Sequence, residues 1–394
     1  VARMIMAGYE WKGDLPFRNV YFTGIIRDKK GRKMSKSLGN SPDPLELIAK
    51  YGADALRFGT MRSAPLGQDV LFDEKDVELG RNFCNKLWNA CRFRQMQGGE
   101  TEGEIRPDLL TSDDRWILLR LGQAIDEVTA AFEAYRFTDA TATLYRFFWS
   151  EYCDWYIESC KATFFGEDAD RKANVLAVVD FVKGNTLRLF HPFLPFITEE
   201  LWHGLGFSSD MPEEQGGRTI MTACWPKAFD TDFRELYGLD DTVDRLVGAK
   251  HELVTQGRNL RAAYNVPFNK KIDYRFQPAG ELDEYEVEVV KILLNAESVA
   301  LGSEVPRGTP RIGSPMGDLF LPLEGLIDFD AERERLAKEL KKIEKEIEKA
   351  EAKLNNPKFA ERAPAEVLEE QRERLTEWQA KRDQINEALG NLSA

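Results

Sequence analysis

Two heptad repeats near the C-terminal end of the sequence constrain its fold more than any other feature. The first places apolar residues alternately four and three apart, at Leu336, Leu340, Ile343, Ile347, Ala350 and Leu354. The second has the same spacing and consists of Leu368, Gln371, Leu375, Trp378, Arg382, Ile385, Leu389 and Leu392. Pro357 and Pro364 lie between the repeats, and proline cannot continue a helix. Because each apolar seam needs a partner, the sequence predicts an antiparallel coiled-coil hairpin over residues 329–394.

The spacing also predicts which residues of this hairpin face each other. If Leu354 pairs with Leu368, the antiparallel direction determines every further pair. The predicted pairs are Ile347 with Leu375, Ile343 with Trp378, Leu336 with Ile385, and Phe329 with Leu392. Leu340 faces a charged residue, Arg382, whose aliphatic stem can pack while its guanidinium reaches water. Each leg should be about 28 Å long or longer at the standard helical rise.

Composition narrows the class of protein. The chain has 394 residues, of which 43% are hydrophobic and 31% charged, and this suits roughly two to four domains. No apolar run approaches the length that spans a membrane. The net charge of −13 argues against binding nucleic acid by bulk attraction, but residues 27–36 form a local basic stripe. Because the chain opens with Val1 and no starter methionine, we expect it to be a piece of a longer protein.

The cysteines predict neither a zinc site nor a disulfide. The five cysteines are Cys84, Cys91, Cys153, Cys160 and Cys224. No Cys-x-x-Cys spacing occurs, so no zinc site is expected. Two pairs lie seven residues apart in helical stretches, about 10 Å along the axis, which is too far for a disulfide. We expect buried, reduced thiols in a cytosolic protein.

Periodicity divides the rest of the chain into three parts. Residues 1–72 contain an apolar run at 19–26, predicted to be a buried strand, then a loop and two short helices, as at the end of an α/β domain. Residues 73–238 show five amphipathic helices of a bundle. Their aromatic stripe could stack on bases, but its helical spacing favours core packing. Over residues 239–328 the pattern predicts a small α+β module with strands at 270–276, 299–301 and 319–323.

The loop over residues 31–40 carries the candidate chemistry. Lys33 and Lys36 stand three apart, Ser35 and Ser37 add hydroxyl groups, and a glycine lies near each end. Lysine ammonium groups suit phosphate, and glycine permits close approach of the backbone. The pattern therefore suits a polyphosphate-binding loop, although composition alone would favour a basic surface turn.

The string Lys-Met-Ser-Lys-Ser at residues 33–37 resembles the signature loop of class I aminoacyl-tRNA synthetases. Residues 43–45 and 51–58 resemble the segment that follows this loop in the valine, isoleucine and leucine enzymes. The chain resembles the valyl-tRNA synthetases most closely at residues 27–28, 81–90, 147–149, 154–158, 191–202 and 258–261. The terminal hairpin also resembles that family, whereas the isoleucine enzyme commonly ends in a cysteine-bearing zinc module.

This resemblance implies ATP-dependent activation of valine and its transfer to tRNA(Val). Lys33 and Lys36 would be catalytic and stabilise charge on the leaving pyrophosphate. The implied ATP-binding set is Lys33, Met34, Ser35, Lys36 and Ser37, with Mg²⁺ bound to ATP and no metal site in the protein. Met34 and Leu38 would anchor the loop by packing. The implied protein is a cytoplasmic monomer without membrane contact.

The resemblance also implies a mainly α fold with four parts. These are the end of an α/β nucleotide-binding domain (1–72), a helical anticodon-binding bundle (73–238), a small α+β module (239–328) and a coiled-coil arm that braces the tRNA (329–394).

The second signature of the class, His-Ile-Gly-His, is missing. The histidines are His191, His203 and His251, and none lies in such a setting. We therefore expect the chain alone to be inactive. Three alternatives remain: a non-catalytic tRNA-binding fragment, an isoleucyl- or leucyl-type synthetase, and a coiled-coil scaffold with a helical adaptor, which would leave the lysine loop unexplained.

Overall fold

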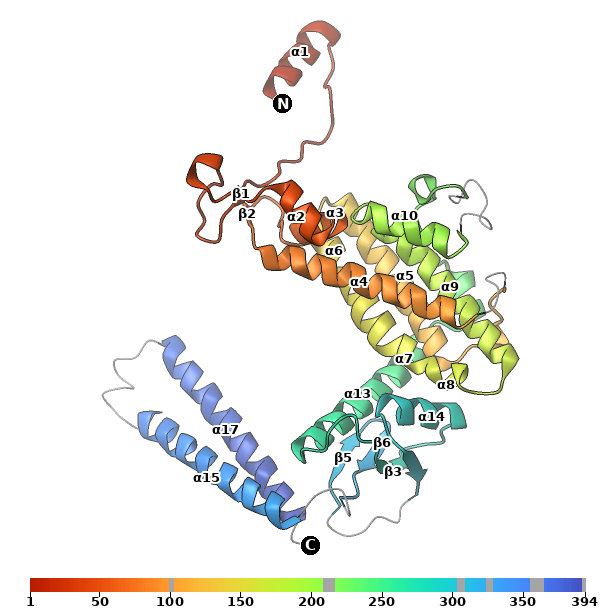
Figure 1. Cartoon of the computed structure of the whole chain (residues 1–394), viewed down its shortest axis with the longest axis vertical. Coiled ribbons are helices and arrows are strands. Elements are labelled where there is room, and N and C mark those ends of the chain that lie inside the picture. Colours follow the sequence, from red (N-terminus) through yellow and green to blue (C-terminus); the bar gives the residue numbers. More distant parts are fainter. Residues whose placement is uncertain (99–102, 208–216, 303–308, 324–328, 355–364, 392–394) are drawn as a thin grey trace. The chain divides into compact units, whose positions relative to one another are not determined.

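The computed structural model describes residues 1–98, 103–207, 217–302, 309–323, 329–354 and 365–391 (Figure 1). A few side chains within these ranges are not described, and that of Lys36 is one of them. The described residues form two compact units, Val1–Asp244 and Arg245–Ala394. Most residues of both units are helical, as predicted.

The first unit begins with a helix and a very small sheet. α1 spans Ala2–Lys12, and β1 (Ile26–Arg27) pairs in parallel with β2 (Val70–Leu71). The prediction of a buried strand over residues 19–26 is wrong, because only its last residue is in a strand and Phe22 is 71% exposed. A two-stranded sheet gives such a run a single neighbour, and an apolar strand needs neighbours on more sides to be buried.

The two helices after the loop form as predicted. α2 covers Pro44–Tyr51 and α3 covers Ala53–Arg62. Asp43 caps α2 by accepting a hydrogen bond from the Leu45 backbone N–H at 2.9 Å, and Pro44 occupies the first helical position. α3 packs closely on the next helix, because a Cβ added to Gly80 would lie 2.3 Å from the backbone oxygen of Ala55.

A bundle of helices makes up the rest of this unit (Figure 1). Its long helices are α4 (Glu74–Met96), α5 (Ser112–Glu133), α6 (Phe137–Tyr145), α9 (Ala169–Phe190) and α10 (Pro195–Gly204). Short elements are α7 (Ile157–Ser159), α8 (Lys161–Phe164), α12 (Thr231–Tyr237) and the 3₁₀ turns η1 (Lys36–Leu38), η2 (Pro107–Leu109) and η5 (Ile220–Thr222). The helical bundle is confirmed.

One helix of the bundle departs from the predicted continuous α-helix over 138–165. After α6 the chain continues as η3, a π-helical stretch at Arg146–Tyr156. Tyr152 and Tyr156 are buried, and Trp149 and Trp155 are half-buried. The aromatic stripe is therefore mainly core, as its helical spacing favoured. Its residues cover more than one face because the π-turns shift the helical phase.

The second unit contains a four-stranded sheet with order β4-β3-β6-β5. Its strands are β3 (Asp273–Pro278), β4 (Ser298–Leu301), β5 (Arg311–Ser314) and β6 (Gly317–Phe320). β3 pairs in parallel with β4 and antiparallel with β6, and α14 (Glu284–Leu293) connects β3 to β4. α13 (Asp241–Ala263) precedes the sheet. The α+β module is confirmed, but β5 was not predicted, because its four residues carry one large apolar side chain, Ile312.

Two long helices complete the second unit. α15 spans Phe329–Leu354 and α17 spans Ala365–Asn391, and the two lie side by side (Figure 1). Leu336, Ile343, Ile347 and Ile385 are buried, so the predicted seam is the surface that the helices share. The pair-by-pair register stays a prediction, and the pair of Phe329 with Leu392 lies outside the described side chains.

Candidate functional site

A carboxylate organises the turn that leads into the lysine loop. Asp28 accepts hydrogen bonds from the backbone N–H groups of Lys30 and Arg32, each at 2.9 Å, and from Arg32 Nε at 2.8 Å. The side chain of Asn40 donates a further hydrogen bond to Asp28 Oδ2 at 3.0 Å. The Asn40 amide, followed by Arg32, holds the pKa of Asp28 well below its usual range. Asp28 therefore stays ionised and keeps the turn closed.

The backbone of the loop is held by one side chain from its far end. Asn40 Oδ1 accepts the backbone N–H of Ser35 at 2.9 Å, and Asn40 Nδ2 donates to the carbonyl oxygen of Lys33 at 3.4 Å. The hydroxyl oxygens of Ser35 and Ser37 lie 3.2 Å apart. These contacts give the residues on both sides of Met34 a defined backbone position.

Both glycines of the loop have a conformational reason to be glycine. Gly31 has φ of 75° and Gly39 has φ of 61°, in the left-handed region where a Cβ is strained. Their role here is to turn the chain at each end of the loop, whereas the sequence suggested close approach of the backbone to a ligand.

The cations around the loop fall into paired and unpaired groups. Arg27 pairs with Asp69, Lys29 with Asp73 at 2.8 Å, and Arg32 with Asp28 at 2.7 Å. Lys33, by contrast, is exposed and makes no ion pair within the described part of the chain. An exposed, unpaired ammonium group can bind a phosphate oxygen.

The remaining loop residues divide between packing and exposure. Met34 is half-buried, in keeping with the predicted anchoring role. Leu38 is 61% exposed, so its predicted role as a packing anchor is wrong. It lies in η1, a single 3₁₀ turn that stands away from any core. Lys36 begins η1, and its side chain lies outside the described set.

α3 connects this end of the unit to the bundle through two charged side chains. Asp54 Oδ2 accepts the backbone N–H of Ile197 at 2.7 Å, at the start of α10. Arg57 donates to the carbonyl oxygens of Pro192 at 3.0 Å and Phe193 at 3.2 Å, beyond the end of α9. Asp54 thus lies at a helix N-terminus, and Arg57 binds carbonyl groups that follow a helix C-terminus, as the helix dipoles favour. These contacts join two of the motifs, residues 51–58 and 191–202, that the sequence analysis singled out.

A buried polar network holds the bundle together. Arg94 forms two hydrogen bonds to Asp180, at 2.8 Å and 2.6 Å, and the two side chains are 4% and 6% exposed. Lys183 Nζ donates to the carbonyl oxygen of Ala90 at 3.0 Å, and burial lowers the pKa of Lys183 to about 8. These charges are enclosed by protein, so their role is structural.

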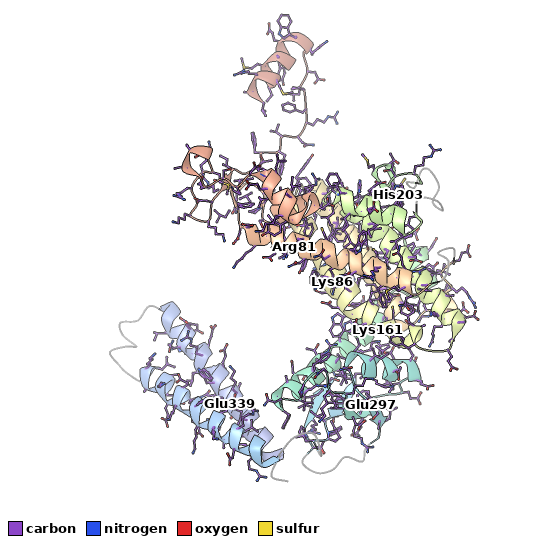
Figure 2. All side chains as sticks on the ribbon, in the orientation of Figure 1. Arg81, Lys86, Lys161, His203, Glu297 and Glu339 are labelled. Carbon is purple, nitrogen blue, oxygen red and sulfur yellow. The ribbon has the colours of Figure 1, made fainter. Side chains whose placement is uncertain are left out.

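The bundle surface carries a groove between α4 and α10. It encloses about 380 Å³ and is lined by Trp88, Arg92, Gln95, Glu200, Leu201 and Gly204. Trp88 is 46% exposed, although its helical spacing suggested a core position. On the same helix, Lys86, whose position Figure 2 labels, pairs with Asp154 at 2.8 Å and lies over the ring of Trp149. An exposed aromatic ring beside an arginine and an amide is suited to a nucleobase.

The arginines of residues 258–261 have a structural role. Arg258 donates to the carbonyl oxygen of Leu293 through Nε at 3.1 Å and Nη2 at 2.7 Å. Arg261 is buried and donates to the carbonyl oxygen of Leu294 at 3.3 Å. Both side chains therefore cap the C-terminal end of α14, where cations are favoured.

The outer face of α15 carries a lysine stripe. Lys338, Lys342, Lys345 and Lys349 each stand two residues after a seam position and are exposed. That spacing places them opposite the apolar seam of the helix pair. Such a row is suited to contact with a phosphate backbone, even in a chain of negative net charge.

The cysteines and the acidic side chains are candidate ligands of a metal ion within the described part of the chain. All five cysteines are free. The prediction that they are buried holds for Cys91, Cys153 and Cys160 but is wrong for Cys84, which is half-buried, and for Cys224, which is exposed. Within the described ranges, no group of three or more histidine, cysteine, aspartate or glutamate side chains is placed to hold a metal ion. Among the described helices, none is long and apolar enough to cross a bilayer.

Comparison with protein families assigns this chain to a class. Residues 1–73 match the model for class I tRNA synthetases of the isoleucine, leucine, methionine and valine group. Residues 114–275 match the anticodon-binding domain of tRNA ligases. The segment with the lysine loop and the helical bundle therefore define part of a class I aminoacyl-tRNA synthetase. Residues 328–393 match the tRNA-binding arm of valyl-tRNA synthetase. The chain is a valine–tRNA ligase homologue and corresponds to the C-terminal portion of that family.

Individual relatives agree with this family. The chain is 41% identical to the valine–tRNA ligase of Carboxydothermus hydrogenoformans and 40% identical to that of Chlorobaculum tepidum, with 100% of this chain and 44% of each relative covered. The Thermotoga maritima enzyme is 41% identical over 95% of this chain and 41% of the relative. The chain thus spans less than half the length of these relatives. Among solved structures, a LeuRS–tRNA–LeuAMS ternary complex from Agrobacterium radiobacter is similar at 24% identity and a TM-score of 0.44, over 60% of this chain and 27% of that one.

Sequence reasoning missed the two residues that organise the loop. Asp28 was singled out only as part of the resemblance at residues 27–28, and Asn40 only as the last residue of the loop. A signal was present, since Asp and Asn both favour side-chain hydrogen bonds to nearby backbone groups. The two residues are twelve positions apart, so their contact could not be found from local spacing.

Proposed function

We propose that this chain supplies the pyrophosphate-binding loop and the tRNA-binding domains of a valine–tRNA ligase. The complete enzyme would activate valine with ATP and transfer it to tRNA(Val). The observation that carries the proposal is the order of the three matched families along one chain, with the unpaired Lys33 inside the class I segment. An accidental basic turn would not be expected beside two tRNA-binding families.

The loop would act on the phosphates of ATP. Lys33 and Lys36 would be the catalytic residues and would stabilise the charge that develops on pyrophosphate as the valine carboxylate attacks the α-phosphate. Ser35 and Ser37 would bind phosphate oxygens, and Met34 would complete the ATP-binding set by holding the loop. Mg²⁺ would enter with ATP, and we assign it no ligand from this chain.

The other parts would hold tRNA(Val). In this proposal the chain divides into the end of the catalytic domain (1–72), the anticodon-binding bundle (73–238), the α+β module (239–328) and the arm (329–394). The groove beside Trp88 would meet unpaired bases, and the lysine stripe of α15 would follow the tRNA backbone. The enzyme would act as a monomer in the cytoplasm, where its free cysteines would stay reduced.

A second candidate is a tRNA-binding chain without catalysis. It is favoured by the matches to the anticodon-binding domain and to the tRNA-binding arm, which would hold tRNA without any reaction. A synthetase of the isoleucine or leucine type was the other alternative, and the match to the valyl arm and to valine–tRNA ligases argues against it.

Exchange of radiolabelled pyrophosphate into ATP separates the two candidates. We expect no valine-dependent exchange by the purified chain, and measurable exchange when the chain is joined to the N-terminal part of the Carboxydothermus enzyme. Exchange with isoleucine or leucine but not valine would contradict the proposal. So would an inactive joined enzyme that is folded and binds tRNA(Val), and that result would favour the non-catalytic candidate.

A further inference from the structure

One side chain connects the two ends of the signature loop, defined here as residues 31–40. Asn40 accepts the backbone N–H of Ser35 and donates both to the Lys33 carbonyl oxygen and to Asp28 Oδ2, at 2.9, 3.4 and 3.0 Å. Lys33 and Ser35 flank Met34, so the amide of Asn40 holds the backbone on both sides of it. A side chain at the end of the loop thereby sets the path of its first half.

Asp28 determines which way the Asn40 amide points. An ionised carboxylate only accepts hydrogen bonds, so the Asn40 NH₂ group must face Asp28. A reversed amide would direct its oxygen at two acceptors, the Asp28 carboxylate and the Lys33 carbonyl, and would leave the Ser35 N–H without its acceptor. Asp28 is itself fixed, because it accepts from Lys30 N and Arg32 N and forms an ion pair with Arg32 at 2.7 Å.

The same contacts keep Lys33 available. A carboxylate offers about four acceptor positions, and Asp28 uses them for Lys30, Arg32 and Asn40. It therefore has no acceptor position left with which to neutralise Lys33, the residue directly after Arg32. Asp28 thus fixes the shape of the loop without neutralising the charge of Lys33.

We propose that Asn40 is a positioning residue for the signature loop and that Asp28 fixes its orientation, so that the pair places Lys33 and Ser35 for the phosphates of ATP. The role toward ATP rests on the proposed function, whereas the effect on loop structure does not. Fixed donors need no rearrangement as charge develops, and small displacements of such groups are costly.

The first test uses the 394-residue chain and needs no catalysis. Asn40→Asp keeps the size of the side chain but places a carboxylate against Asp28. We expect trypsin to cleave after Lys33 and Lys36 about tenfold faster than in the unaltered chain, relative to cleavage after Lys12. Asn19→Asp adds the same charge at an exposed site and should leave these rates unchanged.

The exchange of the two residues is the sharpest control. Asp28→Asn with Asn40→Asp reverses the donor and acceptor and restores one amide–carboxylate hydrogen bond. We expect trypsin to cleave this double variant at least about threefold more slowly than Asn40→Asp, although Arg32 loses its ion pair. Unchanged cleavage in Asn40→Asp, or cleavage equally fast in the single and exchanged variants, would overturn the assignment of the pair.

The second test measures positioning in the joined enzyme. Asn40→Asp should lower the kcat of valine-dependent exchange about tenfold with little change in the KM for valine, and the exchanged pair should recover part of it. Faster cleavage without loss of kcat would show that the pair holds the loop but positions no catalytic group. If the unaltered joined enzyme shows no exchange, the proposed function fails, while trypsin cleavage still decides whether the pair holds the loop.

Discussion

The signature loop and the helical bundle differ in whether their cations are exposed and whether they form ion pairs. In the loop, Lys33 is exposed and, within the described residues, makes no ion pair, while the carboxylates around it are bound to Arg27, Lys29 and Arg32. In the bundle, Arg94 is buried and bound through two nitrogens to Asp180. The first arrangement leaves a charge free for a ligand, and the second uses charge to define packing.

This difference teaches where substitutions should affect stability and where they should affect activity. A buried charge that loses its partner destabilises the fold, because water cannot replace the partner. An exposed lysine that loses its ammonium group costs the fold almost nothing, but removes an interaction from a bound phosphate. The arm provides a third case, because ion pairs such as that between Lys349 and Glu346 lie on its surface, where water can replace either partner.

The largest effect is expected for Arg94→Ala. It leaves Asp180 buried without a partner, and we expect the free energy of unfolding to fall by roughly 3–5 kcal/mol, measured by urea denaturation with tryptophan fluorescence. Replacing both partners, by Arg94→Met with Asp180→Leu, should recover most of this loss. A loss below about 1 kcal/mol for Arg94→Ala would contradict the claim that the buried ion pair of the bundle stabilises the fold.

Lys36→Ala should have a comparable effect on the reaction and none on the fold. Its role follows from the family resemblance, and loss of one positioned donor typically costs roughly 3 kcal/mol of transition-state stabilisation. In the joined enzyme we expect a decrease in the rate of valine activation that is much larger than any change in valine binding. A change confined to the KM for ATP would make Lys36 a ground-state contact instead.

The pH dependence of stability tests the lowered pKa of Lys183 in the buried network. Lys183 faces Cys91 and Arg94 of α4, Asp180 of α9 and Cys153 of η3. Burial lowers its pKa from 10.5 to about 8, so between these values the unfolded chain binds a proton that the folded chain does not. The free energy of unfolding should therefore rise with pH through this window, by on the order of 1–3 kcal/mol in total.

A matched variant isolates this effect from the cysteines. Burial raises the pKa of Cys84 and Cys153 to about 12, and this acts in the opposite direction above pH 9. Lys183→Met removes the lysine contribution and leaves the cysteines in place. The stability of the unaltered chain relative to this variant should increase from pH 8 to 10, and parallel curves would contradict the lowered pKa of Lys183.

The smallest effect is expected in the arm. Lys349 and Glu346 lie 2.6 Å apart, but their side chains are 66% and 43% exposed. Exposed pairs contribute little, because water and salt screen them. Lys349→Ala should change the free energy of unfolding by less than about 0.5 kcal/mol, against several kcal/mol for Arg94→Ala at a similar bond length. A large loss in the arm would show that ion-pair burial is the wrong criterion.

The arm and the bundle also differ in how far sequence predicts them. The heptads predict both arm helices because the repeat itself identifies the residues that face the partner helix. Leu336, Ile343, Ile347 and Ile385 are buried, as this predicts. The bundle helices were predicted as elements, but neither the π-helical stretch nor the exposure of Trp88 follows from a regular 3.6-residue period. Each depends on how helices distant in sequence pack together.

The loop was recognised from five residues, yet the contacts that shape it were not predicted. Lys33, Ser35 and Ser37 lie within five consecutive residues, so their common site is visible in the sequence. The contact of Asp28 with Asn40, and the ion pair of Arg27 with Asp69, each join residues more than ten positions apart. The prediction that residues 19–26 form a buried strand is wrong for a related reason, because the burial of a strand depends on neighbours that local spacing does not show.

The central claim is that an unpaired cation of the loop acts on ATP whereas a paired neighbour does not. Lys33 and Lys29 provide the direct test, since both are exposed lysines and Lys29 is bound to Asp73 at 2.8 Å. The measurement is valine-dependent pyrophosphate exchange by the joined enzyme carrying Lys33→Ala or Lys29→Ala. We predict that Lys33→Ala lowers kcat at least about tenfold and that Lys29→Ala stays within about twofold of the unaltered enzyme. Equal losses in the two variants, or a larger loss in Lys29→Ala, would contradict the account.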